Sequence, residues 1–426
     1  MDNFDLNFDI LIKEINIVSY DGSKKQSIVP QVLRIDIYES ILSPIITCNI
    51  SISDKVNIIE SFPLIQQKVF LEMEYNTPEL ENSIKRRFVV NEVGGRTYDS
   101  QLKTTFYNLH CLSEEVLAHS NQLISRDLSS DEISSEIKRI ITSDIGSKKR
   151  VYVEPTKGTQ KIKVTNLKPF QAIDFLRKKA ISRNYRSNSF IFYENHEGFH
   201  FVTLEWLIST LKGTADAIFY LTLGDAQNTQ GRFRNILGYQ GIVQDNSTNL
   251  LAAGGLFTTH KRIDISTGII QEIDTKPNIS SFLRGIGVNI DAYSSAYAVD
   301  NSKKPGRTAV SVYDSTIPET YSYEQPLKDF YVSLCTKHIS RIYVYGDASL
   351  KCGSSVDLKL PVPNSLPEHM NKVEYSKYTS GKHIVSKIRH MINVQQGTTF
   401  SYHMSLELIR PAYGETQSWL KNLLVM

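Results

Sequence analysis

Residues 190–203 read FIFYENHEGFHFVT, and this stretch decides how the middle of the chain folds. Aromatic and β-branched residues, which favour strands, occupy both of its ends. Asn195 and Gly198 lie near its centre, and both are residue types that favour turns. We therefore predict a β-hairpin in which residues 199–204 return along residues 190–193.

The turn of this hairpin contains a literal H-E-x-x-H motif, formed by His196, Glu197 and His200. On a helix, this spacing places both imidazoles on one face to bind zinc, with the glutamate as general base. In a hairpin, His196 lies in the turn and His200 lies in the returning strand, so the two rings do not converge. The motif also contains a glycine and no strong helix former apart from the glutamate. We predict that these three residues bind no metal and have no catalytic role.

The hairpin belongs to an α/β unit that we place at residues 118–208. Ser129 and Glu132 match a capping box, and isoleucines follow at helical spacing until Gly146. Pro169 occupies the position of a first-turn proline in a second helix. The buried stripe of that helix is expected at Phe170, Ile173, Leu176 and Ala180.

β-Strand patterns dominate on both sides of the α/β unit. Short apolar or alternating runs are separated by clusters of Asp, Gly, Asn and Pro, which suggests small antiparallel barrels or sandwiches. The strands are expected at residues 10–18, 32–38, 45–53, 68–75, 87–93, 103–111, 160–165, 235–244, 259–265, 342–345, 355–360, 383–391 and 400–409. We expect a helix at residues 325–339 and a long connection at residues 296–324.

Length and charge bound the class of protein. A chain of 426 residues is long enough for two to four domains. Its 48 basic and 45 acidic side chains are nearly balanced, so nothing indicates sequence recognition of nucleic acid. The basic cluster at residues 148–150 and the pair Glu114 and Glu115 are interpreted as solvated surface.

Cysteine usage and hydropathy indicate a protein made in a reducing compartment. The four cysteines form no C-x-x-C motif, and we interpret them as reduced, partly buried thiols, although disulfides stay open. The first residues lack the basic and apolar regions of a secretory signal. No apolar run reaches the length of a membrane span, so we expect a soluble chain.

Other candidate chemistry is weaker. His383, His390 and His403 would approach one another only if their strands pair suitably, and histidines on strands are more often packing or surface residues. The chain has no phosphate-binding or dinucleotide-binding glycine motif and no G-x-S-x-G elbow. We therefore predict no cofactor.

Three segments, taken in order, resemble the baseplate hub proteins of contractile-tailed bacteriophages. The first runs from the LKPFQAI segment at residues 167–173 to the hairpin at residues 189–199. The second is the glycine-containing element at residues 346–353. The third is the pair of strand segments at residues 378–390 and 402–410, which is similar to the closing hairpin of that family.

The resemblance implies an α+β, mainly β, fold with two similar antiparallel β-barrel domains, an α/β domain between them and an inserted domain. It further implies a homotrimer in the virion tail baseplate, assembled in the host cytoplasm. Such a hub presents six barrels and adapts the sixfold tail tube to the threefold central spike, with other baseplate or wedge proteins as neighbours. The domains are placed at residues 1–117, 118–208, 209–240 with 325–412, and 241–324, followed by a tail at residues 413–426.

Two alternatives remain open from the sequence. One is a tail-associated hydrolase or zinc metalloprotease that uses the HEGFH segment. The other is the base of a type VI secretion spike protein, which would normally continue into a spike repeat that this chain lacks.

Overall fold

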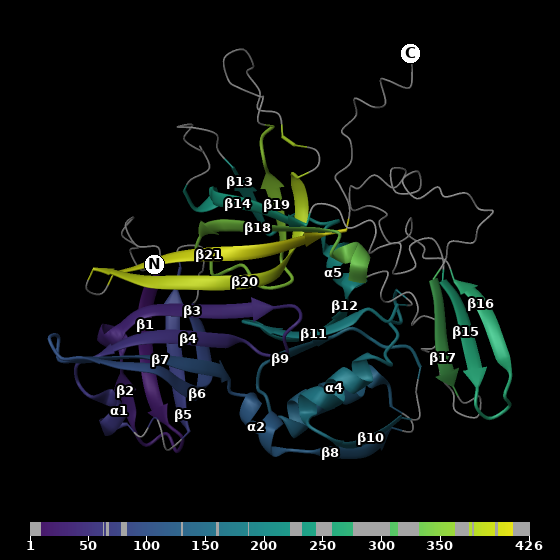
Figure 1. Ribbon diagram of the computed structural model, residues 1–426, viewed down its shortest axis with the longest axis horizontal. Helices are drawn as coiled ribbons and strands as arrows, with labels where there is room; N and C mark the ends of the chain where they lie inside the picture. Colours follow the sequence, from purple (N-terminus) through teal and green to yellow (C-terminus); the bar gives the residue numbers. More distant parts are fainter. Residues whose placement is uncertain are drawn as a thin grey trace, which may run out of the picture.

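The fold is taken from a computed structural model of the chain (Figure 1). The structure describes residues 10–62, 64, 68–77, 83–128, 131–158, 162–185, 187–221, 232–243, 258–275, 307–313, 332–362, 375–376, 379–396 and 399–411. The prediction for Ser129 and those for the C-terminal tail and most of residues 241–324 lie outside them.

The N-terminal strands form an antiparallel array in the order β3-β4-β7-β6-β5-β1-β2. Their side chains alternate strictly in places: in β4, Cys48, Ile50 and Ile52 are fully buried while their neighbours reach the surface. The predicted strands are confirmed. The bounds are β1 (Leu11–Ser19), β2 (Lys25–Ser27), β3 (Val32–Ser40), β4 (Thr47–Asp54), β5 (Val69–Asn76), β6 (Ile84–Asp99) and β7 (Thr104–Ser113), with a 3-10 helix at Val29–Gln31 and α1 at Ile58–Ser61.

The C-terminal strands continue the same sheet. They follow the order β14-β18-β21-β20, and β20 pairs antiparallel with β3, from Lys387 opposite Ser40 to Asn393 opposite Arg34. The bounds are β13 (Ala217–Tyr220), β14 (Ile236–Val243), β18 (His338–Tyr345), β19 (Ser355–Lys359), β20 (Gly381–Gln396) and β21 (Thr399–Arg410), with a 3-10 helix at Arg232–Arg234. Figure 1 shows β20 and β21 lying along β3 and β4.

This seam between β3 and β20 differs from the sequence prediction of separate barrels. The strands form one sheet of 13 members, and within the described residues its pairings run in an open order that closes no ring. Alternation in a sequence defines which face of a strand is buried, but it does not identify the strand's partner. One core cluster accordingly extends from β1 to β21.

Helices and short strands follow the N-terminal strands, and they lie beside those strands and below β20 and β21 in the view of Figure 1. α4 begins at Pro169, and the backbone N–H of Lys168 donates to Gln171 Oε1 at 3.2 Å. Gly146, at φ +72°, follows the first long helical segment. The bounds are α2 (Val116–Asn121), β8 (Ile124–Leu128), α3 (Ile133–Arg139), a π-helical turn (Ile140–Asp144), β9 (Arg150–Val153), β10 (Ile162–Leu167), α4 (Pro169–Arg177), β11 (Phe190–Asn195), β12 (Gly198–Thr203) and α5 (Leu204–Thr210).

Two local predictions need correction, and one helix was not predicted. Residues 332–335 are helical, but the predicted helix at residues 325–339 cannot reach its end, because β18 starts at His338 and pairs there with β21. α5 was not predicted, although Thr203 caps it by accepting from the Trp206 backbone N–H. The expected connection at residues 296–324 contains the strand β17 (Arg307–Tyr313).

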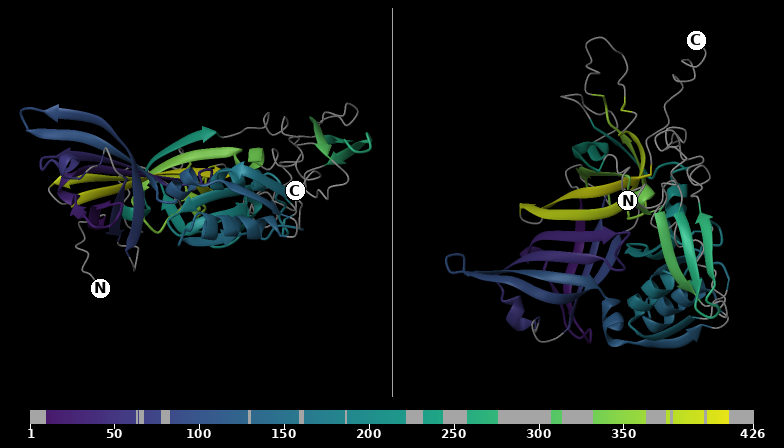
Figure 2. Two further views of the ribbon diagram at one scale, coloured as in Figure 1. Left: turned by 90° about the horizontal axis from the view of Figure 1, so that it is seen from below. Right: turned by 45° about the vertical axis from the view of Figure 1, so that its right-hand side comes forward.

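β17 is part of a small separate sheet with the order β16-β15-β17. β15 (Thr258–Asp264) confirms a predicted strand, and it pairs antiparallel with β16 (Ile270–Thr275) and parallel with β17. Figure 2 shows this sheet at the opposite end of the molecule from the N-terminal strands.

All four cysteines are free and buried, in agreement with the prediction of reduced thiols. Cys48 and Cys111 lie opposite each other on β4 and β7, where burial raises the pKa of both thiols. No helix in the described part of the chain is long and apolar enough to cross a membrane.

Candidate functional site

The β11–β12 hairpin occupies the place where three parts of the fold meet. Its strands pair from Phe190 opposite Thr203 to Asn195 opposite Gly198, which confirms the predicted hairpin. β12 also pairs parallel with β9, and Gly198 lies opposite Arg150. The H-E-x-x-H motif is therefore not helical: it occupies the turn and the returning strand.

Two members of the motif, His200 and Glu197, contact residues outside it. The His200 ring stacks between Tyr152 and Tyr193, with ring centroids 4.6 and 4.9 Å away, and its Nε2 lies 3.1 Å from Asn195 Oδ1. Glu197 forms an ion pair with Lys351 at 2.5 Å. Among the described residues, no three His, Cys, Asp or Glu side chains are grouped to hold a metal ion. The absence of a bound metal stays a prediction.

The three C-terminal histidines do not converge either. His383 Nδ1 lies 2.7 Å from the Gly381 carbonyl, and His390 Nδ1 lies 2.7 Å from the Tyr402 hydroxyl. His403 pairs with Met391 across β20 and β21, and Met391 is the neighbour of His390 on its strand. Because adjacent residues on a strand point to opposite faces, His390 and His403 lie on opposite sides of the sheet.

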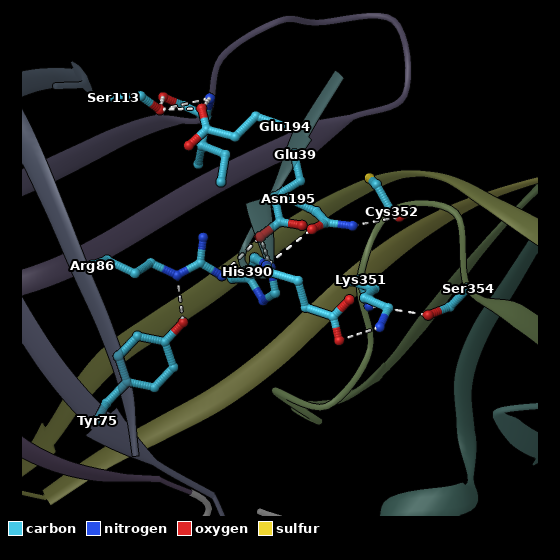
Figure 3. Close-up of polar contacts among 12 residues, drawn as sticks. Glu39, Tyr75, Arg86, Ser113, Glu194, Asn195, Lys351, Cys352, Ser354 and His390 are labelled. Atoms are coloured by element: carbon cyan, nitrogen blue, oxygen red, sulfur yellow. Dashed lines mark hydrogen bonds and ion pairs between the residues drawn. The ribbon is translucent and has the colours of Figure 1, made fainter. Parts of the chain in front are cut away.

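Glu194 joins the hairpin to the N-terminal strands (Figure 3). Its Oε2 accepts from the Ser113 hydroxyl at 2.6 Å and from the Ile46 backbone N–H at 3.1 Å. Its Oε1 accepts from Lys149 Nζ at 2.6 Å, and the same ammonium reaches Glu115 at 2.8 Å. Burial opposes the charge on Lys149, but the two carboxylates outweigh burial and raise the pKa of Lys149.

This network corrects two sequence predictions. Glu115 was interpreted as solvated surface, but it is 5% exposed. Lys149 belongs to the basic cluster that was interpreted as a solvated loop, yet it bridges Glu115 and Glu194. Sequence neighbours gave no indication of this, because the partners of Lys149 are 34 and 45 positions away.

The other side of the hairpin tip contacts the loop between β18 and β19. Asn195 Nδ2 donates to the Cys352 carbonyl at 3.2 Å, and Lys351 pairs with Glu197. Gly353 adopts φ +91°, and a Cβ atom there would lie 2.5 Å from the Tyr193 hydroxyl. Only glycine therefore fits both the backbone conformation and the close approach of the tyrosine.

A buried ion pair lies next to the tip (Figure 3). Arg86 on β6 donates to Glu39 on β3 at 2.7 Å and to the Tyr75 hydroxyl at 2.9 Å, and both charged side chains are at most 5% exposed. His390 Nε2 from β20 lies 3.6 Å from Glu39. Burial alone would raise the pKa of Glu39, but Arg86 and His390 outweigh it and hold that pKa well below its usual range.

The geometry thus describes a polar junction. Charged side chains from β3, β6, β11 and the β18–β19 loop are mutually neutralised within the described residues around the hairpin tip. Sequence reasoning missed Glu39 and Arg86 altogether. The only signal in the sequence was the placement of each charge at an inward position of an alternating strand.

Acid is expected to weaken this junction. Burial lowers the pKa of His196 and of His200 to about 4, against roughly 6.5 in an unfolded chain. The unfolded chain therefore binds protons that the folded chain does not, so the stabilisation is complete above pH 6.5 and decreases as the pH falls towards 4. For each histidine, lowering the pH from roughly 7 to 5 is expected to reduce the free energy of unfolding by about 1–2 kcal/mol. Urea unfolding at the two pH values measures this loss.

A His200→Gln variant provides the control for that experiment. Its free energy of unfolding should depend less on pH over the same range, because one of the titrating groups is gone. An unchanged slope in this variant would contradict the assignment of the acid effect to the hairpin.

No family model matches the chain, and no curated protein matches its sequence. Among solved structures, it is similar to a tail protein from Neisseria meningitidis MC58, with a TM-score of 0.54 and 10% identity, covering 93% of this chain and 96% of that one. It is also similar to the 43 kDa tail protein of prophage MuSo2 from Shewanella oneidensis, with a TM-score of 0.55 and 12% identity. That match covers 93% of this chain and 98% of the other.

A third solved structure is the E. coli c3393 protein, described as a component of the type VI secretion system. It has a TM-score of 0.45 and 10% identity over 95% of this chain and 78% of that one. The two tail proteins show the fold, and the resemblance stated from the sequence is confirmed at that level.

Proposed function

We propose that this chain, which has the fold of phage tail proteins, is the structural baseplate hub of a contractile tail and not an enzyme. In this role it forms a homotrimer that joins the sixfold tail tube to the threefold central spike in the virion baseplate. The observation that carries the proposal is the continuous sheet across the seam between β3 and β20.

The two halves of that sheet support the expectation of two similar units per chain. Counting outwards from the seam, one half has the order β3-β4-β7-β6 and the other has β20-β21-β18-β14. Each half starts with two strands that are consecutive in the chain, and every neighbouring pair in both halves is antiparallel. Because β3 and β20 are themselves antiparallel, a twofold axis through the seam would relate the halves.

Three copies with two such units each would present six similar surfaces. This number matches a sixfold tube on one side, while the threefold assembly itself matches a threefold spike. We retain the proposed domains at residues 1–117, 118–208, 209–240 with 325–412, and 241–324, with a tail at residues 413–426. The β11–β12 junction would hold the α/β domain rigidly against both halves.

Within the described part of the chain, the geometry does not favour the hydrolase alternative. Its motif lies in a hairpin and not on a helix, and Glu197 is paired with Lys351. Hydrolysis of peptidoglycan or protein by the purified chain, abolished by Glu197→Gln, would overturn the non-enzymatic assignment.

The size of the assembly tests the hub proposal directly. We expect light scattering to give about 145 kDa, three times the chain mass of 48.4 kDa, and electron micrographs to show a threefold ring. The measurement should be made alone and with a tail tube protein and a spike protein. A chain that stays monomeric in every mixture would contradict the proposal.

A further inference from the structure

A groove of about 410 Å³ crosses the seam on the polar face of the continuous sheet. Strands β4, β3, β20, β21 and β18 contribute to it, so both halves of the sheet form its walls. Its lining includes Tyr38, Arg341, Tyr343, Lys387, Arg389 and Glu407.

Strand register arranges these side chains in two rows. In one row, Arg341 lies opposite Glu407, and Glu407 lies opposite Lys387. In the next row, Tyr343 and Tyr38 are the outer members, with Ser405 and Arg389 between them. The two tyrosines are three strand spacings apart, or roughly 14 Å at about 4.8 Å per spacing. This width accommodates one extended peptide segment with its side chains.

Charge is layered within the groove. The cationic side chains of Arg341, Lys387 and Arg389 are 38%, 51% and 41% exposed. The carboxylates that pair with them are more deeply placed: Glu407 is 15% exposed and Asp36 is 12% exposed. The outer surface of the groove is therefore cationic, while the carboxylates below hold the cations in position.

The cations keep the capacity to bind further acceptors. Lys387 lies 2.8 Å from Glu407, and the Arg389 Nε lies 3.0 Å from Asp36 with its guanidinium 5.4 Å from the centre of the Tyr38 ring. A guanidinium has five N–H donors and an ammonium has three, so these contacts do not use all of the donors. Carboxylates are among the acceptors that such donors bind most strongly in proteins.

We propose that this groove binds an acidic, extended segment of a partner protein. A protein segment fits better than nucleic acid, because its carboxylates can be spaced to meet the cations and to avoid Glu407 and Asp36, whereas a phosphate backbone is charged at every step. Tyr38 and Tyr343 supply amphipathic walls of the kind found at protein interfaces. The proposal goes beyond the hub function and does not depend on the trimer.

Occupation of the groove would also join the two halves of the sheet. The partner would contact Tyr38 and Thr47 from the N-terminal half and Arg341, Lys387 and Arg389 from the C-terminal half. A partner that binds only the folded chain stabilises the folded state relative to the unfolded state. The acidic segment is thus expected to raise the melting temperature as well as to bind.

The test uses the full chain and a fluorescein-labelled deca-glutamate peptide, followed by fluorescence anisotropy at low and high salt. We expect saturable binding that weakens with salt and loses roughly tenfold or more in affinity in a Lys387→Glu/Arg389→Glu variant. The matched control is Lys85→Glu/Arg87→Glu on β6, which makes the same charge change at exposed paired residues outside the groove. Its affinity should stay within about twofold of the wild type.

A second groove variant and a nucleic acid competitor complete the experiment. If the charge-reversed variant does not fold, as judged by circular dichroism, Lys387→Gln/Arg389→Gln replaces it with the same expected direction. Equal loss in the groove variant and the β6 control would overturn the proposal, as would no binding by the wild-type chain. Tighter binding of a single-stranded DNA decamer than of the peptide would assign the groove to nucleic acid and overturn it as well.

Discussion

Replacing Arg86 with alanine is expected to lower the free energy of unfolding by about 3–5 kcal/mol. The substitution leaves the Glu39 carboxylate fully buried without its cation, and it removes the donor to the Tyr75 hydroxyl. An uncompensated charge in the interior is among the most destabilising single changes known in proteins. Urea unfolding at neutral pH, followed by circular dichroism, measures the loss.

Two further variants separate this effect from a general loss of side-chain volume. Lys85→Ala removes the adjacent cation on β6, which is 76% exposed, and should change the stability by less than about 0.5 kcal/mol. The double variant Glu39→Leu/Arg86→Met should recover most of the free energy of unfolding that Arg86→Ala loses, because it leaves no unpaired carboxylate in the interior. Arg86→Ala with wild-type stability would show that the pair does not form.

Gly198→Ala is expected to cost about 3 kcal/mol or more. The glycine adopts φ +145°, which side-chain-bearing residues rarely adopt, and a Cβ atom there would lie 2.1 Å from the Arg150 carbonyl oxygen. That oxygen belongs to the backbone of β9 and has no rotamer by which to move away. Relief of the clash would have to separate β12 from β9, and this would displace the hairpin tip from the junction.

Gly213→Ala is the matched control, because its added Cβ would meet only the Thr210 carbonyl at an ordinary 3.5 Å. The readout is the same chemical unfolding experiment, with near-ultraviolet circular dichroism to follow the aromatic stack at Tyr152, His200 and Tyr193. A Gly198→Ala protein as stable as the control would refute the packing of the hairpin against β9.

Much of the secondary structure followed from local pattern. The alternation in residues 383–391 predicted a strand, and the aromatic flanks of the HEGFH segment predicted a hairpin against the helix that its motif suggests. Both features depend on residues within a few positions of one another. Local pattern failed where a strand partner far away in the sequence determines the structure. His338 was predicted to be helical, but it belongs to β18 because it pairs with β21.

The junction was beyond sequence reasoning for the same reason. Glu39 meets Arg86 across 47 positions, and Glu194 meets Ser113 across 81. In the sequence, the two charges of a buried ion pair cannot be distinguished from surface charges unless the pairing of their strands is known. Glu115 and Lys149 were predicted as solvated because exposure was judged from their immediate neighbours alone.

The seam between β3 and β20 has a consequence for synthesis. Asp36 and Arg389, which meet across it, are 353 positions apart in the chain. At a translation rate of about 5–20 residues per second, roughly 20–70 s pass between the synthesis of β3 and that of β20. During that time one edge of β3 has no strand beside it, and an open edge can pair with another nascent chain. Completion of the sheet is thus a late, non-local folding step, and the growing chain needs protection from premature self-association until its last strands emerge.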